Sequence, residues 1–362
     1  MLADEFPVDA ESSVLRRKFA FSVGNDPNRM PWRRMRNIAT FNGGSDMSFV
    51  EGKHIVVTGG AGFLGREVCA ELKLFSPASV FVPLSKDYDL REKSAICRLF
   101  EHVPDIVIHL AAVAGGIGAN RDNPGRFFYE NAIMGIELME QARLCGVKKF
   151  VVVGSICSYP KFTPVPFRED DLWNGYPEET NAPYGLAKKM LVVQAQAYRQ
   201  QYGFDAISLL LVNLYGPADN YDLHTSHVIP ALIRKVVEAQ QAQCDWIDAW
   251  GTGSVSREFL FVRDAARAIV LATDRYNRPD PVNLGSGMEI NIRELAELIL
   301  ELCDFHGEIR WDSSKPDGQP RRCLDTTRAC DAFGFKSQTS LRDGLMETIT
   351  SYRQQVASCP LA

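Results

Sequence analysis

Residues 54–65 read His-Ile-Val-Val-Thr-Gly-Gly-Ala-Gly-Phe-Leu-Gly, an apolar run followed by closely spaced glycines. The apolar run predicts a short buried strand, and residues 66–74 have the composition of a helix. Between the two, Gly59, Gly62 and Gly65 would permit a tight turn, the close approach of a pyrophosphate and close packing of helix on strand. Phosphates would lie at the helix N-terminus, where free N–H groups favour anions. The stretch therefore predicts a dinucleotide-binding strand–turn–helix unit.

The alternation of strand and helix continues beyond the glycine turn. Apolar runs predict further strands at 79–84, 105–110, 149–154 and 206–212, helical segments at 120–131 and 132–144, and a helix that bears Tyr184. Strands that alternate with helices indicate a parallel sheet with helices on both faces. We therefore expect an α/β fold, a doubly wound parallel sheet of the Rossmann type, with a smaller, mostly helical C-terminal substrate domain.

The length of 362 residues suits about two domains. We expect a flexible N-terminal extension at 1–50, where an acidic start precedes basic clusters. The acidic residues in it argue against a mitochondrial or plastid presequence. The cofactor-binding domain is expected at 51–220 and 257–285, and the substrate-binding domain at 221–256 and 286–362.

Composition excludes several classes of function. A net charge of −5 gives no indication of a nucleic-acid or anionic-membrane partner, and no apolar run reaches the length of a membrane span. The nine cysteines are scattered and include no Cys-x-x-Cys pair. This pattern argues against a disulfide framework or a zinc site and favours a reducing compartment. We expect a cytoplasmic protein that binds no metal, nucleic acid or membrane.

Four reactive side chains lie in the stretch from 151 to 188: Ser155, Cys157, Tyr184 and Lys188. Tyr184 and Lys188 are four residues apart, so on a helix they share a face. An ammonium next to a phenol favours the phenolate, so we expect Lys188 to lower the pKa of Tyr184. The pair would then donate a proton while the Ser155 hydroxyl holds a carbonyl oxygen. The alternative is a surface Tyr and Lys on an ordinary helix.

The tip of the second expected strand bears on the choice of cofactor. Ser85 and Lys86 stand where an NAD site usually has an acidic residue, and a cation there suits a 2′-phosphate. NADP(H) is therefore favoured over NAD, with Asp89 next to the adenine, although Lys86 could also be a solvated loop residue. After the third strand, the small side chains of Ala111 and Ala112 would let the backbone lie close to a ligand.

Beyond the glycine turn, Ser155 and the Tyr184/Lys188 pair, several stretches make the chain resemble the extended short-chain dehydrogenase/reductase superfamily. Within it, the chain resembles the GDP-L-fucose synthase family, which are epimerase–reductases of GDP-4-keto-6-deoxy-D-mannose. The resemblance covers residues 53–350 approximately. The stretches that carry it are residues 114–120, 154–160, 181–184, 213–220, 226–232, 250–253, 257–259 and 315–318.

The resemblance implies a role for each matching residue. The catalytic residues would be the reductase triad Ser155, Tyr184 and Lys188 and the epimerisation pair Cys157 and His227. The substrate-binding residues would be Lys235, Trp250, Arg257 and Lys315. The cofactor-binding residues would be Gly59, Gly62, Phe63, Leu64, Gly65, Lys86, Asp89, Leu110, Ala111, Ala112, Tyr184, Lys188, Asn213 and His227. The family also implies a homodimer, formed through the helices that bear 120–144 and 183–199 as a four-helix bundle.

The implied reaction agrees with the chemistry of these groups. A ketone at carbon 4 acidifies the hydrogens on carbons 3 and 5, and groups that titrate near neutrality, such as Cys157 and His227, suit their exchange. Reduction of the ketone by NADPH would then give GDP-L-fucose. Taken alone, Cys157 would be a small buried hydrophobe and His227 a helix cap.

One departure from the family pattern leaves the strictness for NADPH open. Many members have an Arg where Ala61 stands, so the 2′-phosphate would be held by Lys86 or Arg66. Two neighbouring functions remain as alternatives, a sibling GDP-sugar enzyme of the colitose or deoxy-heptose type and a nucleotide-sugar 4-epimerase. A non-catalytic NADP-sensing scaffold is the remote alternative, against which the intact triad argues.

Overall fold

The computed structural model describes residues 48–315 and 317–358. The extension expected at 1–50 therefore lies, up to residue 47, outside the described residues. The described helices are α1 (Phe63–Leu72), α2 (Lys93–Phe100), α3 (Ile117–Asp122), α4 (Pro124–Leu144), α5 (Ala182–Tyr202), α6 (Val228–Gln241), α7 (Val262–Arg275), α8 (Ile292–Cys303), α9 (Thr327–Phe333) and α10 (Leu341–Ser358). Short 3₁₀ helices are η2 (Lys73–Phe75), η3 (Ile156–Ser158) and η4 (Glu169–Trp173).

The central sheet is parallel throughout and has the order β2-β1-β3-β4-β5-β9. Its strands are β1 (His54–Thr58), β2 (Ser79–Phe81), β3 (Ile106–His109), β4 (Lys149–Ser155), β5 (Ala206–Leu211) and β9 (Val282–Leu284). The chain passes from β2 on one side of β1 to β3 on the other, so the doubly wound sheet is confirmed.

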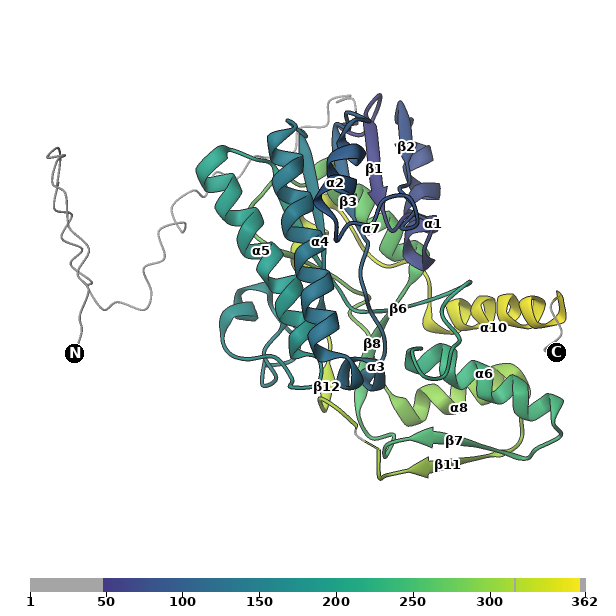
Figure 1. Cartoon of the computed structure of the whole chain (residues 1–362). Coiled ribbons are helices and arrows are strands. Elements are labelled where there is room, and N and C mark those ends of the chain that lie inside the picture. The colour runs from purple at the N-terminus through teal and green to yellow at the C-terminus, as the bar shows by residue number, and fades with distance from the viewer. Residues whose placement is uncertain (1–47, 316, 359–362) are drawn as a thin grey trace, which may run out of the picture. The chain divides into compact units, whose positions relative to one another are not determined.

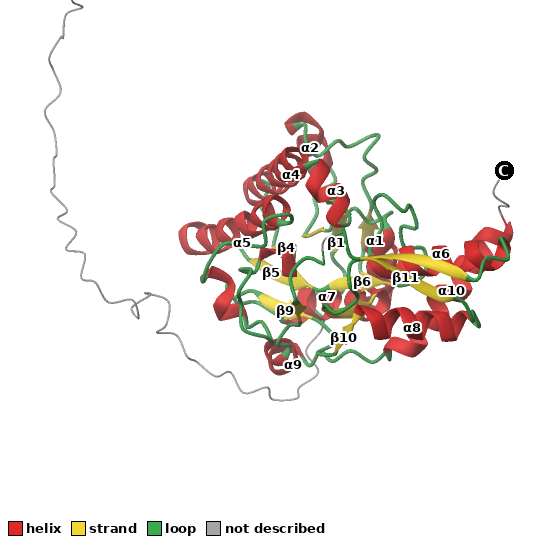
Figure 2. Cartoon of the chain, turned by 90° about the horizontal axis from the view of Figure 1, so that it is seen from below, coloured by secondary structure: helices red, strands yellow, loops and turns green. Residues whose placement is uncertain are grey.

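Both faces of this sheet are buried under helices (Figures 1 and 2). On β4, Val151 packs into a core with α1 and α7, whereas Val152 packs into a second core with α2, α4 and α5. Successive side chains on a strand point to opposite faces, so a strand covered on both sides reads as a continuous apolar run. This is why β4 was recognisable from its sequence.

A second group of elements carries its own hydrophobic core (Figure 1). It contains α6, α8, α10 and the parallel pair β7 (Trp246–Trp250) and β11 (Glu308–Asp312). A small sheet joins β10 (Glu289–Asn291), β8 (Ser256–Phe261) and β12 (Arg321–Arg322), and β6 (Asn213–Tyr215) pairs with β8. The C-terminal part is thus helical with several short strands, and the exact domain boundaries stay a prediction.

Some element boundaries differ from those expected. The break in the helical region falls at Asn123 rather than after residue 131, because Pro124 occupies the first helical position and disfavours helix in the residue before it. Strand β2 ends at Phe81 rather than residue 84, where Pro83 has no N–H to donate to a neighbouring strand. Helix α1 begins at Phe63, directly after Gly62, rather than at Arg66.

Within the described ranges, no helix combines the length and the apolar composition that a bilayer-spanning segment requires.

Candidate active site

The glycine turn leaves no room for side chains. Gly59 has a φ of +72°, and a Cβ placed on it would lie 2.8 Å from the backbone nitrogen of Ala111. A Cβ on Gly65 would lie 2.1 Å from the carbonyl oxygen of Gly59. Gly62 is the N-cap of α1, whose first turn contains no acidic residue. The close-packed turn in front of a helix N-terminus therefore fits the pyrophosphate of a dinucleotide, as the sequence predicted.

Two cations stand near this turn. Lys86 is exposed in the turn after β2 and makes no ion pair with a described residue. Arg66 donates from its Nε to the carbonyl oxygen of Ala61 at 2.9 Å. Asp89 is engaged by Arg91 at 2.7 Å, and hydrogen bonds from Arg91 lower the pKa of Asp89 to about 2. Both cations are therefore available to a 2′-phosphate. The nearby carboxylate of Asp89 is already paired with Arg91.

The end of β4 places Ser155 and Cys157 against the first turn of α5. The backbone N–H of Cys157 donates to Ser155 Oγ at 3.2 Å, which makes Ser155 the cap of η3. Ser158 Oγ donates to the carbonyl oxygen of Gly185 at 3.0 Å. A Cβ on Gly185 would lie 2.1 Å from the carbonyl oxygen of Cys157, so only glycine allows this approach. The hydroxyl and the thiol are thereby held beside Tyr184, the residue before Gly185.

The expected lowering of the Tyr184 pKa is wrong for the free protein. Burial raises the pKa of Tyr184, and the charge of Cys157 raises it further. Burial also lowers the pKa of Lys188 to about 8. The cost of removing each charge from water is the largest cause of both shifts. Tyr184 therefore keeps its proton at neutral pH, which suits a proton donor.

His109 lies at the end of β3 and was not predicted as a site residue. Its Nδ1 lies 2.8 Å from Thr58 Oγ1, whereas its buried Nε2 has no hydrogen-bond partner among the described residues. Burial, and then the charge of Lys188, lowers the pKa of His109 to about 3. His109 is therefore a neutral ring beneath the site. A polar residue at the end of an apolar strand was the signal that could have indicated it.

Two buried guanidinium groups lie near the thiol. Arg322 donates from Nη1 to Cys157 Sγ at 3.8 Å. Arg257 on β8 donates to the carbonyl oxygens of Ser256 and Asp317 at 2.7 and 2.9 Å. Burial, and then the charge of Arg322, lowers the pKa of Arg257 to about 10. The sequence did not place Arg322 beside Cys157, because the contact depends on tertiary structure.

His227 comes from the second group of elements and occupies the N-cap of α6. Its side chain makes no capping hydrogen bond, so the structure does not support the helix-cap alternative. The residue is exposed, yet desolvation lowers the pKa of His227. No hydrogen bond joins its ring to the described residues.

The expected substrate residues surround the ends of β7 and β8. Trp250 is 55% exposed, and Lys315 Nζ lies 5.5 Å from the centre of its ring. Lys235 on α6 donates from Nζ to the carbonyl oxygen of Asp248 at 2.8 Å, and burial lowers its pKa. An exposed indole with cations next to it suits a nucleotide diphosphate. Asn213, expected at the cofactor, donates to the carbonyl oxygen of Glu258 at 3.2 Å.

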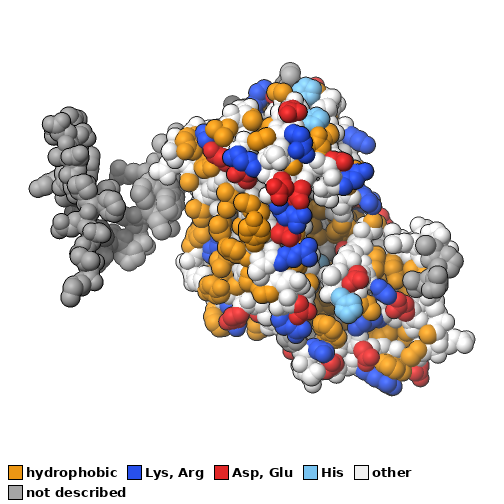
Figure 3. Space-filling model, viewed as in Figure 1, with side chains coloured by type: hydrophobic (Ala, Val, Ile, Leu, Met, Phe, Trp, Pro, Cys, Tyr) orange, Lys and Arg blue, Asp and Glu red, His pale blue; other side chains and the backbone are white. Residues whose placement is uncertain are grey.

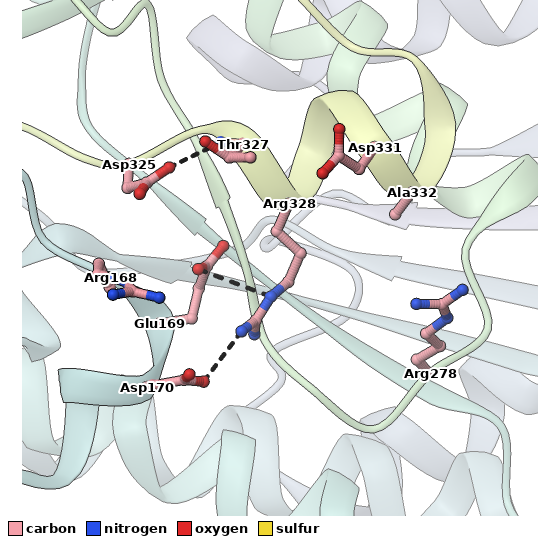
Figure 4. Close-up of a pocket in the computed structure, with 9 residues that line it drawn as sticks. All are labelled: Arg168, Glu169, Asp170, Arg278, Asp325, Thr327, Arg328, Asp331 and Ala332. Atoms are coloured by element: carbon pink, nitrogen blue, oxygen red, sulfur yellow. Dashed lines mark hydrogen bonds and ion pairs between the residues drawn. The ribbon is translucent and has the colours of Figure 1, made fainter. Parts of the chain in front are cut away.

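A cavity of about 340 Å³ lies apart from these residues, between η4 and α9 (Figure 4). Arg328 pairs there with Asp170 at 3.0 Å and with Glu169 at 3.7 Å. Glu169 also accepts from the backbone N–H of Asn283 at 3.0 Å. None of the predicted site residues lines this cavity. Its ion pairs join η4 to α9, which is a structural role.

The arrangement beside β4 can perform acid–base chemistry next to a carbonyl group. Ser155 and Tyr184 can donate hydrogen bonds to an oxygen, and Cys157 can exchange a proton with an adjacent carbon. Buried cations at Lys188, Arg257 and Arg322 favour negative charge there. Phosphates of a cofactor and of a substrate fit on either side of this cluster.

Comparisons with known proteins agree with this arrangement. Residues 55–285 match the NAD dependent epimerase/dehydratase family. A probable GDP-L-fucose synthase 1 of Oryza sativa subsp. japonica is 41% identical over 310 residues, which cover 85% of this chain and 94% of the relative. GDP-L-fucose synthase 1 of Arabidopsis thaliana is 40% identical over 318 residues, which cover 87% and 98%.

A solved structure gives the same result in three dimensions. The GDP-L-fucose synthetase of Naegleria fowleri with NADP bound superposes with a TM-score of 0.78 and 28% sequence identity. The match covers 86% of this chain and 97% of the other. The fold, the glycine turn and the matched length together lead to one assignment: this chain belongs to the NAD dependent epimerase/dehydratase family.

Proposed function

We propose that the chain converts GDP-4-keto-6-deoxy-D-mannose to GDP-L-fucose, by epimerisation at carbons 3 and 5 and NADPH-dependent reduction at carbon 4. Relatives named GDP-L-fucose synthase are 39–41% identical over at least 85% of this chain. The observation that carries the proposal is the position of Cys157. A reductase alone needs Ser155, Tyr184 and Lys188, whereas an epimerase–reductase also needs a proton carrier at the reacting carbons.

In the epimerisation, Cys157 removes a proton from the carbon next to the ketone. The electron pair of the C–H bond forms a carbon–carbon double bond, and the carbonyl π pair moves onto the oxygen, where Ser155 and Tyr184 donate hydrogen bonds to the enolate. His227, on the other side of the cleft, returns a proton to the opposite face of the carbon. The imidazolium form of His227 gives up this proton and becomes a neutral imidazole, a release that its lowered pKa favours, and solvent then returns the proton.

In the reduction, a bound NADPH supplies the hydride to carbon 4. Tyr184 delivers its phenolic proton to the oxygen at carbon 4, which its raised pKa keeps available at neutral pH. Lys188, one turn along α5, orients the cofactor and stabilises the tyrosinate that the transfer leaves behind. Ser155 keeps the oxygen in place through both steps. Trp250, with Lys235, Arg257 and Lys315, holds the GDP portion.

We also propose that two copies associate through α4 and α5. These helices pack against each other and expose apolar side chains, which gather on one face in Figure 3. Helices that expose this many large apolar groups commonly form an interface. The exposed groups are Phe128, Tyr129 and Leu144 on α4 and Met190, Val193 and Tyr202 on α5.

A sibling substrate is the second candidate. A GDP-L-colitose synthase of Yersinia pseudotuberculosis is 34% identical over 297 residues. The match covers 81% of this chain. In this alternative the same catalytic side chains would act on a different GDP-keto-sugar. The choice between the two depends on how the sugar fits between Cys157 and His227.

The test is to incubate the protein with GDP-4-keto-6-deoxy-D-mannose and NADPH in heavy water. We expect stoichiometric loss of NADPH absorbance and a product that carries deuterium at carbons 3 and 5. A 4-epimerase would consume no NADPH, and a pure reductase would leave both carbons protiated. Preference for another GDP-keto-sugar, measured as a higher kcat/KM, would instead support the sibling function.

A further inference from the structure

Outside its own segment, the thiol of Cys157 accepts a hydrogen bond from Arg322. The guanidinium donates from Nη1 to Cys157 Sγ at 3.8 Å, across 165 residues of sequence. Its Nε donates to Gln319 Oε1 at 2.9 Å. Gln319 in turn donates from Nε2 to the carbonyl oxygen of Lys161 at 2.6 Å. The guanidinium is thus held in a fixed orientation with one N–H directed at the sulfur.

The backbone around Arg322 is fixed as well. Strand β12 pairs with β8, which places Arg322 opposite Arg257. On the following residue, the carbonyl oxygen of Cys323 accepts from the N–H of Phe167 at 2.8 Å. The side chain of Arg322 is only 7% exposed and that of Gln319 only 4%. The guanidinium of Arg322 is therefore held in one place beside the sulfur of Cys157.

No carboxylate balances this charge. Within residues 48–315 and 317–358, Arg322 and Arg257 form no ion pair with an Asp or Glu. Burial opposes ionisation of Glu178, but hydrogen bonds to its carboxylate from Thr180 and Asn181, at 2.6 and 2.7 Å, lower its pKa, and the charge of Arg322 adds only a smaller effect. Tyr184, facing the thiol from α5, is neutral. The sulfur of Cys157 is therefore the group able to carry negative charge that is in hydrogen-bond contact with this guanidinium.

We propose that Arg322 is a positioning residue that holds Cys157 in its thiolate form and so makes it the base of the epimerisation. A cation next to a cysteine favours the thiolate, which is the reactive form. In the proton transfer the sugar C–H bond breaks and an S–H bond forms. The negative charge moves from the sulfur to the enolate oxygen, and Arg322 and Arg257 remain close to both. The second half of the proposal rests on the proposed function.

The test measures the reactivity of the thiol without any sugar. Iodoacetamide is added to the free enzyme at pH 7, and the rate of carbamidomethylation is followed by mass spectrometry on the tryptic peptide 150–161, whose only cysteine is Cys157. We expect R322Q to slow this rate by roughly tenfold, because the thiolate loses a charged hydrogen bond. R322K keeps the charge and should stay within about threefold of wild type.

Arg321 supplies the matched control. It is the neighbouring residue on β12, its side chain is 60% exposed, and it pairs with Glu289 at 2.6 Å. R321Q removes the same charge from the same strand and should leave the rate within about twofold of wild type. Binding of NADPH, followed by its fluorescence, verifies that each variant is folded.

Three results would overturn the proposal. R322Q could react as fast as wild type, R321Q could slow the reaction as much as R322Q, or R322K could be as slow as R322Q. If R322Q does not fold, the carbamidomethylation rate of R322K decides the test. A large loss of rate in R322K, which keeps the charge, would show that the charge is not the cause.

A second arm separates this proposal from the proposed function. Deuterium exchange into GDP-4-keto-6-deoxy-D-mannose, with oxidised cofactor present, should fall in R322Q in parallel with alkylation, with little change in KM. Absence of exchange in the wild-type protein would refute the proposed function alone. Exchange at full rate in an R322Q variant that alkylates slowly would refute the role of Arg322 in the base.

Discussion

Replacing Lys188 by Met should stabilise the free protein while abolishing its reductase activity. Lys188 is 2% exposed and makes no hydrogen bond or ion pair with a described residue. Burial lowers its pKa from 10.5 to about 8. A pKa shift of one unit corresponds to about 1.36 kcal/mol of free energy. The charged ammonium therefore destabilises the folded state by roughly 3 kcal/mol at pH 7. Met fills a similar volume without the charge.

The sign of the pH dependence follows from the lowered pKa. Below pH 8 the amine is charged in both the folded and the unfolded states, and the whole cost is present. Between pH 8 and 10.5 the folded state has lost the proton while the unfolded state keeps it, so wild-type stability from this group rises with pH. The advantage of Lys188→Met should therefore shrink from roughly 3 kcal/mol at pH 7 to about 1.4 kcal/mol at pH 9.5.

The neighbouring Lys189 is the matched control. It is also buried, but its Nζ donates to the carbonyl oxygen of Leu172 and lies 4.7 Å from the centre of the Trp173 ring. Lys189→Met leaves a buried carbonyl without its donor, which costs about 1–3 kcal/mol. The two adjacent substitutions should thus change stability in opposite directions.

The assay is thermal unfolding by circular dichroism at pH 7 and 9.5, without cofactor. For a chain of this size we expect Lys188→Met to raise Tm by roughly 5–10 °C at pH 7. Lys189→Met should lower it. If both variants lowered Tm by similar amounts, or if the gain from Lys188→Met were the same at both pH values, a buried uncompensated ammonium would not be the cause.

Three further predictions concern the reaction. Tyr184→Phe should retain NADPH binding and lose roughly two or more orders of magnitude in steady-state reduction, and unchanged turnover would remove the phenol from the mechanism. Lys86→Glu should weaken NADPH far more than NADH in fluorescence titrations, whereas equal losses would show that Lys86 does not contact the 2′-phosphate. With oxidised cofactor in heavy water, Cys157→Ser should lose deuterium incorporation at carbons 3 and 5, and His227→Asn should slow it. Full deuteration by both variants would contradict the assigned roles.

The sheet was predictable because its strands are covered on both faces. Each inner strand then reads as an apolar run, and the glycine turn fixed the first crossover. Two of the boundaries that failed were set by prolines, since Pro124 moved the helix break and Pro83 shortened β2. The strands of the second group, such as β12 with two residues, are too short and too polar for a sequence pattern to reveal them.

The site was predictable where its residues share one element or one sequence motif. Tyr184 and Lys188 share a helix face, and Ser155 and Cys157 share a strand end. Arg322 was not placed beside them, because its contact with Cys157 needs β12 to pair with β8. The direction of the Tyr184 pKa was also missed, since the degree of burial depends on what packs around a side chain and not on its neighbours in sequence.

The electrostatics of the site connect its stability to its function. The chain has a net charge of −5. The buried groups around Cys157 nevertheless include Lys188, Arg257 and Arg322, none of which forms an ion pair with a carboxylate among the described residues. Burial lowers the pKa of Lys188 and of Arg257, which is the mark of positive charge that the free protein does not balance. NADPH and a GDP-sugar both bring phosphates. The charge that weakens the free protein is therefore the charge that binds its ligands, and at a ligand concentration of 100 Kd each should return about 2.7 kcal/mol of stability.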